Sequence, residues 1–525
     1  MSIELIKNLQ KPELYNHPVK YFKLFESHIS WVILTGGLVY KIKKPVDFEF
    51  LNYSTLEKRE FYCHEEIRLN KLLSPEIYVD VVTINGSVEN PTINGKGKII
   101  DYAVRMHEFP QDQIFGHLLA EKKLTPELID RLAKLIAEFH KKTLVAPAAT
   151  AFGSPTNVHA PVVQNFDQIF TFLTDEKELA VIAGLRKWAD EQFHTHHELL
   201  QYRKNKGFIR DCHGDLHLGN IIYFNYNKPL LFDRIEFNDE FRWTDVVADI
   251  AFLAMDLDDH KQSALSHRLI NDYFNATGDY EGLALLPYYL SYRAVVRAKV
   301  ALFSLSPTNL TEAQCAAIWQ HHRDLIRLAQ QYMVKKPPAL LITHGVTGSA
   351  KSSVARLIVE KLAAIQINSD IERKRLFTLP PNAQTNSELN SGIYHPDTTA
   401  KTYNRLADIA KIIINAGYPV IIDATFLKQE QREKFYQLAK FLQVPFAILH
   451  CQAPRAQVEQ WINARKAEKD DPSEAGVEVL TMQEKAIEPL TDHEKKLSIN
   501  IDTTKIDETV LLEHINRILQ NNRAK

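Results

Sequence analysis

The sequence has 525 residues, of which 45% are hydrophobic and 24% are charged, and its formal net charge is -2. This length allows two to four globular domains at roughly 100–200 residues each, and the near-neutral charge excludes a global attraction to nucleic acid or membrane. With no apolar run near the ~18 residues of a membrane helix, no secretory signal segment and four widely spaced cysteines that fit neither disulfides nor zinc, we expect a cytoplasmic protein without a membrane partner.

The first predicted element is a β-hairpin. Residues 29–34 and 38–42 are rich in β-branched and aromatic side chains and are separated by Thr35-Gly36-Gly37, a pattern typical of two strands joined by a glycine turn. Lys41 lies in the second strand. It is either an exposed base or, if an acid on the next helix orients it, a lysine that grips nucleotide phosphates.

Such an acid follows on a predicted helix. Residues 55–73 carry a rough apolar stripe at helical spacing, and they include the adjacent acids Glu65 and Glu66. We favour Glu66 as the partner of Lys41. Residues 101–110 then predict a strand that runs into a linker.

Residues 211–233 hold the groups of a phosphotransfer site in the order that its chemistry needs. Asp215 can accept the proton of an attacking hydroxyl, Asn220 can hold a metal ion on the nucleotide, and Asp233 can hold the same ion or a second one. A strand over 220–224 and a turn over 225–229 would return the chain, so that Asp233 reaches the same place. A match of this kind could arise by chance on a surface loop, but the hairpin and the third acid favour the catalytic interpretation.

The sequence His213-Gly214-Asp215-Leu216-His217 with Asn220, together with Phe232-Asp233, resembles aminoglycoside phosphotransferases and related small-molecule kinases. Protein kinases are a poorer match, because they usually place arginine where Gly214 stands. The resemblance implies a bilobal α+β kinase-like domain over residues 1–332, with an N-lobe of about 1–106 and a C-lobe of about 107–332. It also implies ATP and Mg²⁺ as cofactors, with residues 101–110 joining the lobes.

A helical bundle is predicted after the catalytic segment. Asp249 lies near the start of its first helix, where it could tie back to the catalytic loop. Further on, Tyr289, Arg293 and Arg297 fall on one helical face. That face would suit an anionic or carboxylate-bearing substrate, or it would form salt bridges to acids of the bundle. The sequence over 292–299 also looks like bacterial phosphotransferase-like proteins that carry an ATPase domain behind this one.

Residues 333–338 predict a linker, because Pro337-Pro338 forbids helix continuation. An apolar strand over 339–344 then leads into a loop and a helix, the arrangement of a phosphate-binding P-loop. Ala350 departs from the pattern, which has glycine there, and would cost on the order of 1 kcal/mol if its backbone is left-handed. The residues predicted to bind nucleotide are Gly345, Gly348, Lys351, Ser352 and Ser353, with the Ser352 hydroxyl on magnesium.

Two acids follow at predicted strand ends. Asp423 ends an apolar strand, as a magnesium-side acid would, and Asp370 follows another strand with Arg373 three residues on. Alternating strands and helices predict an α/β domain with a parallel sheet over 339–525. This part resembles polynucleotide kinases and zeta-toxin-like kinases. The resemblance implies that Asp370 is the base, that Arg373 holds the acceptor and that Arg465 stabilises the transferring phosphoryl group.

We therefore predict a bifunctional ATP- and Mg²⁺-dependent phosphotransferase that acts on a hydroxyl of a small molecule and carries a second, P-loop kinase domain. Two alternatives stay open. The C-terminal domain is a nucleic-acid 5′-hydroxyl kinase, or one domain is a non-catalytic nucleotide sensor that regulates the other.

Overall fold

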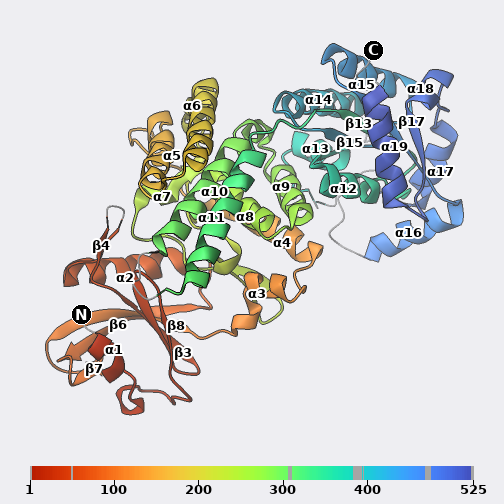
Figure 1. Ribbon diagram of the computed structural model, residues 1–525. Coiled ribbons are helices and arrows are strands. Elements are labelled where there is room, and N and C mark those ends of the chain that lie inside the picture. The colour runs from red at the N-terminus through yellow and green to blue at the C-terminus, as the bar shows by residue number, and fades with distance from the viewer. Residues whose placement is uncertain are drawn as a thin grey trace. The chain divides into compact units, whose positions relative to one another are not determined.

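The computed structural model describes residues 3–48, 51–305, 310–381, 383, 393, 395–467 and 475–521. The chain divides into two compact units, Met1–Asp256 and Leu257–Lys525 (Figure 1). This division falls before the linker at 333–338, and the domain boundaries inferred from the sequence remain predictions.

The first unit begins with an antiparallel sheet of six strands in the order β1-β2-β3-β8-β6-β7. The predicted hairpin is β2–β3, and Val32 lies opposite Lys41 across it. One face of the sheet packs on an apolar cluster that includes Leu5 and Ile6 of helix α1. The strands and helices of this part are α1 (Ile3–Asn8), β1 (Lys23–Glu26), β2 (Ser30–Leu34), β3 (Leu38–Lys43), β4 (Asp47–Phe48), β5 (Leu51–Asn52), α2 (Leu56–Asn70), β6 (Tyr78–Gly86), β7 (Pro91–Ile93) and β8 (Ile99–His107).

The opposite face of this sheet determines where the site lies. Helix α2 packs on β6 and β8, and its buried Cys63 shares an apolar cluster with Val104 of the sheet and with Ile222 and Leu230 of a later hairpin. Burying these side chains together fixes the helix and the hairpin against the same sheet. The acids that these two elements carry are thereby brought near β3.

The remainder of the first unit is mostly helical. The predicted hairpin after the predicted catalytic loop is formed by β10 and β11, and its turn residues Asn225 and Tyr226 have φ of 50° and 51°, the positive values that tight hairpin turns commonly require. The elements are α3 (Phe115–Ala120), α4 (Pro126–Lys142), α5 (Pro155–Phe170), α6 (Glu176–Asn205), β9 (Ile209–Asp211), β10 (Ile221–Phe224), β11 (Lys228–Leu231), α7 (Asp239–Arg242), β12 (Trp243–Asp245) and α8 (Val246–Asp259), whose last turn enters the second unit.

The second unit contains a parallel sheet of five strands in the order β14-β15-β13-β16-β17, so the predicted parallel sheet is confirmed. All five residues of the central strand β13 are buried, as expected for a strand covered on both faces. The strands are β13 (Leu340–His344), β14 (Ile365–Asn368), β15 (Val420–Asp423), β16 (Phe446–Gln452) and β17 (Ser498–Asp502).

Helices surround this sheet and precede it in the chain. Helix α12 buries Val354 and Ile358 against the sheet residues Leu341 and Leu449, which fixes the loop that leads from β13 into α12. The helices are α9 (Ser263–Thr277), α10 (Leu286–Phe303), α11 (Glu312–Gln331), α12 (Lys351–Leu362), α13 (Ser369–Leu376), α14 (Pro396–Asn415), α15 (Gln429–Phe441), α16 (Arg455–Ala467), α17 (Val477–Ala486), α18 (Asp492–Lys496) and α19 (Glu508–Asn521). Among the helices that the structure describes, none combines the length and the apolar character needed to span a bilayer.

Candidate phosphotransfer sites

Three residues predicted from distant parts of the sequence meet in the first unit. Lys41 Nζ on β3 lies 2.9 Å from Glu66 Oε1 on α2 and 2.5 Å from Asp233 Oδ1, which follows β11. Glu65, the other acid of the pair, instead forms a salt bridge with Arg68 on the helix surface. The geometry therefore favours Glu66 as the partner of Lys41, while the catalytic roles of these residues remain predictions.

A second lysine completes this network. Lys43 Nζ lies 2.6 Å from Glu66 Oε2 and also pairs with Glu236, which accepts a 2.5 Å hydrogen bond from the Tyr53 hydroxyl. Burial would raise the pKa of Glu66, but the charges of Lys41 and Lys43 outweigh it and lower the pKa to about 2. Glu66 is therefore ionised at neutral pH and shared by two lysines. The sequence analysis missed Lys43, although its spacing of two residues from Lys41 places both on one face of the strand.

Asp215 and Asn220 are hydrogen-bonded to each other. Asn220 Nδ2 lies 3.0 Å from the Asp215 carbonyl oxygen and 3.2 Å from its Oδ2. The Asp215 side chain is 40% exposed, and His217 Nε2 lies 3.4 Å from its Oδ2. Because the Asn220 amide nitrogen donates to Asp215, the oxygen of the same amide is the atom that could bind a cation. The Phe232 N–H donates to the Asn220 carbonyl at 3.0 Å and connects this loop to the strand before Asp233.

Asp249 of α8 fixes the backbone of the predicted catalytic loop. Its two carboxylate oxygens accept the backbone N–H groups of Gly214 at 2.8 Å and His213 at 3.0 Å. The buried His213 ring connects the other side of the loop, since its Nε2 lies 2.9 Å from the Phe232 carbonyl. Burial lowers the pKa of His213, so a neutral ring donating through Nε2 fits this contact.

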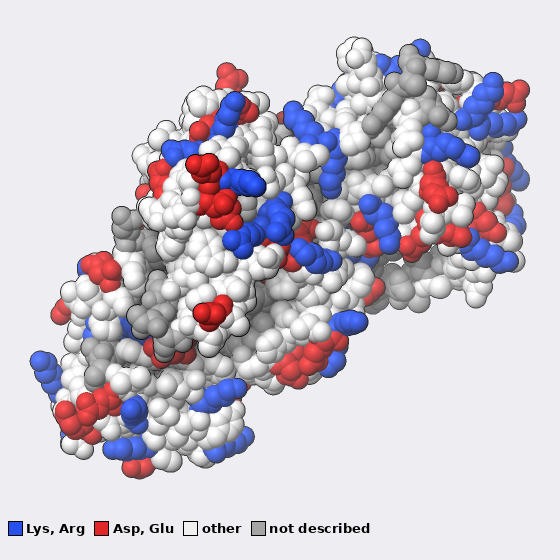
Figure 2. All heavy atoms as spheres, in the orientation of Figure 1, with Lys and Arg blue, Asp and Glu red and all other residues white. Residues whose placement is uncertain are grey.

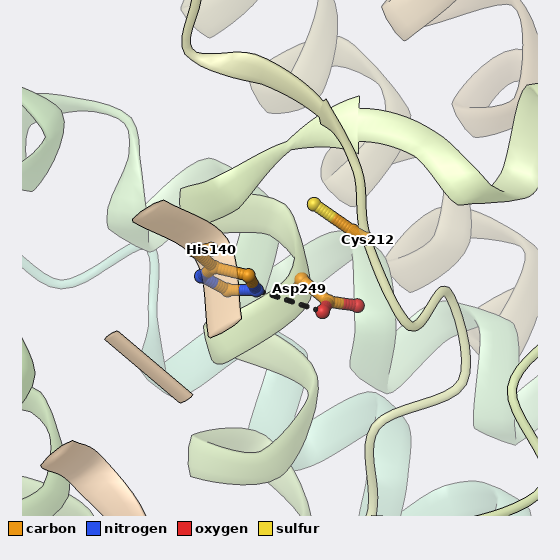
Figure 3. A group of neighbouring side chains, drawn as sticks. All are labelled: His140, Cys212 and Asp249. Carbon is orange, nitrogen blue, oxygen red and sulfur yellow. Dashed lines mark hydrogen bonds and ion pairs between the residues drawn. The ribbon is translucent and has the colours of Figure 1, made fainter. Parts of the chain in front are cut away.

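Figure 3 shows the buried side chains of His140, Cys212 and Asp249. Among the described residues, these three alone have potential metal-ligand atoms close enough together to hold an ion. His140 Nε2 lies 3.0 Å from Asp249 Oδ2. Burial would raise the pKa of Asp249, but the bond to His140 lowers it to about 2. Burial also raises the pKa of the Cys212 thiol well above its ordinary value, so the thiol keeps its proton and contacts the Thr244 carbonyl. With Asp249 engaged by the loop, this group supports the loop and does not fit a metal centre.

The predicted P-loop connects β13 to α12 in the second unit. Gly345 and Gly348 have φ of 147° and 75°, and a Cβ at either would come within 2.6 Å of Cys451 O or Ile462 Cγ1 respectively. Ala350 has φ 55° and ψ 28°, which is left-handed. Alanine in place of the usual glycine therefore costs on the order of 1 kcal/mol here, because its Cβ is strained in a left-handed backbone.

The residues after the loop contact the predicted magnesium-side acid. Ser352 Oγ donates to Asp423 Oδ2 at 2.7 Å, and Lys351 Nζ donates to the Val346 carbonyl within the loop at 2.6 Å. Burial raises the pKa of Asp423, although the hydrogen bond from Ser352 opposes this effect. Ser353, the next residue of α12, is exposed. A serine hydroxyl beside a carboxylate is a donor set that suits Mg²⁺.

Two amide side chains that the sequence analysis did not single out lie beside this acid. Asn368 Nδ2 lies 3.1 Å and Gln366 Nε2 lies 2.8 Å from Asp423 Oδ2. The other end of the Asn368 amide caps helix α13, accepting the Asp370 N–H at 2.9 Å. Asp370 in turn pairs with Arg373 at 2.6 Å. Asn368 therefore connects Asp370, the predicted base, with Asp423, the predicted magnesium ligand.

Two further predictions concern residues on helices. Tyr289 and Arg293 on α10 are buried, with 2% and 7% of their surface exposed, and Arg297 is half-buried. The Arg293 guanidinium lies 5.3 Å from the Tyr292 ring centroid. These residues belong to the second unit, whereas Asp215 belongs to the first, and their role in substrate binding remains a prediction. Arg465 falls within α16, but its side chain lies outside the described residues.

Known proteins match the two parts of the chain separately. Residues 59–286 match a model described as the phosphotransferase enzyme family, and residues 340–490 match one described as an AAA domain. An uncharacterized protein of Mycobacterium tuberculosis and one of Mycobacterium bovis are each 27% identical over 458 residues, which are 87% of this chain and 89% of theirs.

Two solved structures are similar to portions of the chain. Amicoumacin kinase hAmiN, in complex with AMP-PNP, Ca²⁺ and Ami, is 12% identical, with a TM-score of 0.39, over 62% of this chain and 96% of its own. The APS kinase CysC of Mycobacterium tuberculosis is 18% identical, with a TM-score of 0.25, over 35% and 99%. The two family matches, with the sheets described above, confirm the predicted fold class: a kinase-like α+β domain followed by an α/β P-loop domain.

Proposed function

The chain carries a domain of the phosphotransferase enzyme family followed by a P-loop domain, as the sequence predicted, and from this premise we propose that it is a bifunctional ATP-dependent kinase. Its first part transfers the γ-phosphoryl group of ATP to a hydroxyl of a small molecule. The observation that carries this proposal is the salt-bridge network of Lys41, Glu66 and Asp233, which joins three separate elements. A cytoplasmic location belongs to the same proposal.

The residues of the first site have distinct tasks in this proposal. Asp215 orients the acceptor hydroxyl and accepts its proton, for which its partly exposed carboxylate is suited. Lys41 binds the phosphates, and to do so it exchanges its contact with Asp233 for one with the nucleotide. Asn220 and Asp233 offer the amide and carboxylate oxygens that Mg²⁺ prefers. A bound magnesium ion would neutralise charge on the phosphates.

Lys43 keeps Glu66 in an ion pair while Lys41 exchanges its partner. Glu66 is fully buried, and its Oε2 stays paired with Lys43 when Lys41 turns toward a nucleotide. Glu66 therefore keeps an opposite charge beside it, and the cost of an isolated buried carboxylate is avoided. Catalysis at this site then consists mainly of positioning and charge neutralisation.

The P-loop part is proposed as a second kinase. Lys351 and the loop N–H groups would bind the phosphates, and Ser352 with Asp423 would hold magnesium, as their 2.7 Å hydrogen bond supports. Asp370 would be the base for its acceptor hydroxyl, and Arg373 and Arg465 would hold the acceptor and the transferring phosphoryl group.

Two observations bear on the alternatives for this second part. A nucleic-acid 5′-hydroxyl kinase needs a basic groove, and the face of the second unit drawn in Figure 2 carries positive and negative side chains side by side. A nucleotide sensor needs binding without efficient turnover. The left-handed Ala350 is the motive for that alternative, because it departs from the usual glycine, and the intact acids Asp370 and Asp423 argue against it.

A screen of phosphoryl transfer from labelled ATP tests the proposal. Sugars, nucleosides, RNA ends and antibiotics would be offered to the full chain and to two variants, Asp215→Asn and Lys351→Ala. We expect at least one small-molecule product that depends on Asp215 and does not depend on Lys351. Transfer to RNA ends that depends on Lys351 would support the nucleic-acid alternative. Binding of ATP without transfer at the P-loop would support the sensor.

A further inference from the structure

Helix α9 belongs by sequence to the stretch that matches the phosphotransferase family, residues 59–286. In the structure it packs within the second unit, against the P-loop helix α12 and the strand β14. Its Arg268 and Asp272 form salt bridges with Glu360 and Arg356 of α12, at 2.7 and 3.0 Å. The helix is therefore bound to the scaffold of the P-loop by charged contacts as well as by packing.

Two asparagines of α9 close the open edge of the parallel sheet. Strand β14 is the edge strand, and on its inner side the Ile365 N–H bonds to the Pro419 carbonyl. On the outer side, the Gln366 N–H donates to Asn271 Oδ1 at 2.8 Å, and the Gln366 carbonyl accepts from Asn275 Nδ2 at 2.7 Å. Edge groups of this kind are otherwise left to solvent or to another strand. Here both are paired with buried side chains of α9.

The same residue reaches the predicted magnesium acid with its side chain. Gln366 Nε2 lies 2.8 Å from Asp423 Oδ2, the oxygen that also accepts the Ser352 hydroxyl. Gln366 is 7% exposed and Asp423 is 3% exposed. The backbone contacts to α9 therefore fix the residue whose amide sets the position of the Asp423 carboxylate.

Helix α9 and the turn that follows it also contact α13, which carries Asp370. The Tyr280 hydroxyl lies 3.2 Å from Glu372 Oε1, and Arg375 of α13 donates to the Asn275 carbonyl. Gly278 ends α9 with φ of 73°, and a Cβ there would lie 3.0 Å from the Arg375 guanidinium carbon. Both acids of the P-loop site are therefore supported from α9.

We propose that Asn271 and Asn275 of α9 are positioning residues for the magnesium site of the P-loop, acting through Gln366. This inference rests on the proposed function of the P-loop part, and it makes the phosphotransferase-family stretch and the P-loop structurally dependent on each other. The outer partners of a metal site commonly change metal affinity by 10–100-fold when they are removed. A chain that began after the linker, at residue 339, would lack these contacts.

The test measures how much Mg²⁺ tightens the binding of ADP to the full chain. All variants also carry Lys41→Ala, which should weaken nucleotide binding in the first unit. The further change Lys351→Ala should abolish binding at the P-loop and serves as the negative control. We expect Gln366→Met to reduce the tightening by Mg²⁺ roughly 10-fold, and Asn271→Ser to reduce it about 3-fold. The affinity for ADP without Mg²⁺ should stay within about 2-fold, a result that general destabilisation would not produce.

Gln262→Met is the matched control, because Gln262 precedes α9 and makes no side-chain capping bond. If Lys351→Ala binds ADP as well as the parent does, the proposed function of the P-loop part and this inference both fail. If Lys351 matters but Gln366→Met and Asn271→Ser keep the full effect of Mg²⁺, the inference alone is overturned. Hydrogen exchange at the Gln366 amide gives a second reading, since Asn271→Ser should accelerate it in a folded chain.

Discussion

The two sites predicted to bind phosphate are held together by different physical means. In the first unit, Lys41 lies between the carboxylates of Glu66 and Asp233, so its charge is held by ion pairs from distant elements. In the second unit, Lys351 donates to the Val346 carbonyl of its own loop. The first site depends on packing of β3, α2 and the β10–β11 hairpin, whereas the second depends mainly on the backbone conformation of one short loop.

This difference determines what each site tolerates. An ion network buried between elements is costly to break, because a removed partner leaves an uncompensated charge. A backbone loop tolerates loss of a side chain but is sensitive to the φ angles that its residues can adopt.

Replacing Asp215 with asparagine should abolish most phosphoryl transfer by the first unit. The amide cannot accept the proton of the acceptor hydroxyl, and general base catalysis contributes roughly 10²–10⁴-fold. The rate with any acceptor found in the screen would be measured at saturating ATP. Glu65→Gln is the control, since Glu65 pairs with Arg68 on the surface of α2. Retention of the parent rate by Asp215→Asn would contradict the assigned role.

Lys43→Met should destabilise the first unit more than Lys351→Met destabilises the second. Lys43 is 1% exposed and pairs with both Glu66 and Glu236, so its loss leaves two buried carboxylates with one cation fewer. Breaking a buried pair costs about 3–5 kcal/mol. Urea unfolding followed by hydrogen exchange would assign the loss to each unit. Equal losses in the two variants would remove the contrast between the sites.

The first unit should also lose stability at acid pH. The pKa of Glu66 falls from an ordinary value of 4.5 to about 2 in the folded chain, so the unfolded state binds its proton first as the pH falls. The stabilisation is present above about 4.5 and is lost as the pH approaches 2, amounting to about 3 kcal/mol. Urea unfolding of the first unit between pH 6 and 3 would measure this slope. The variant Glu66→Gln should flatten it, and an unchanged slope in that variant would exclude Glu66 as its source.

The same contrast explains what the sequence could predict. The P-loop is contiguous, so its glycines, Lys351 and Ser352 could be predicted from spacing alone, whereas the left-handed conformation of Ala350 was established only by the structure. In the first unit, the motif around Asp215 could likewise be recognised from the spacing of its residues. The choice between Glu65 and Glu66 needed the register of α2 against the sheet.

Other contacts had no sequence signal strong enough to find them. Lys43 and Glu236 lie 193 positions apart, and they meet because the hairpin before Glu236 packs on the same sheet that contains β3. The Asn271–Gln366 contact joins residues on either side of the predicted linker. Single-sequence patterns report local periodicity, and they carry no direct record of which distant side chains meet.

The smallest effect concerns Ala350 and tests whether the second loop is tuned by its backbone. Glycine adopts φ near 55° without the cost of a Cβ, so Ala350→Gly should raise the stability of the second unit by up to about 1 kcal/mol. Ala363, at the end of α12, has φ of 52°, and Ala363→Gly should relieve similar strain away from the phosphates. Calorimetric titration with ADP would separate the two. We expect tighter binding, by up to about 5-fold, for Ala350→Gly alone, because 1.4 kcal/mol corresponds to 10-fold. Equal binding by both variants would mean that the left-handed alanine affects only folding, and the sensor alternative would lose its physical basis.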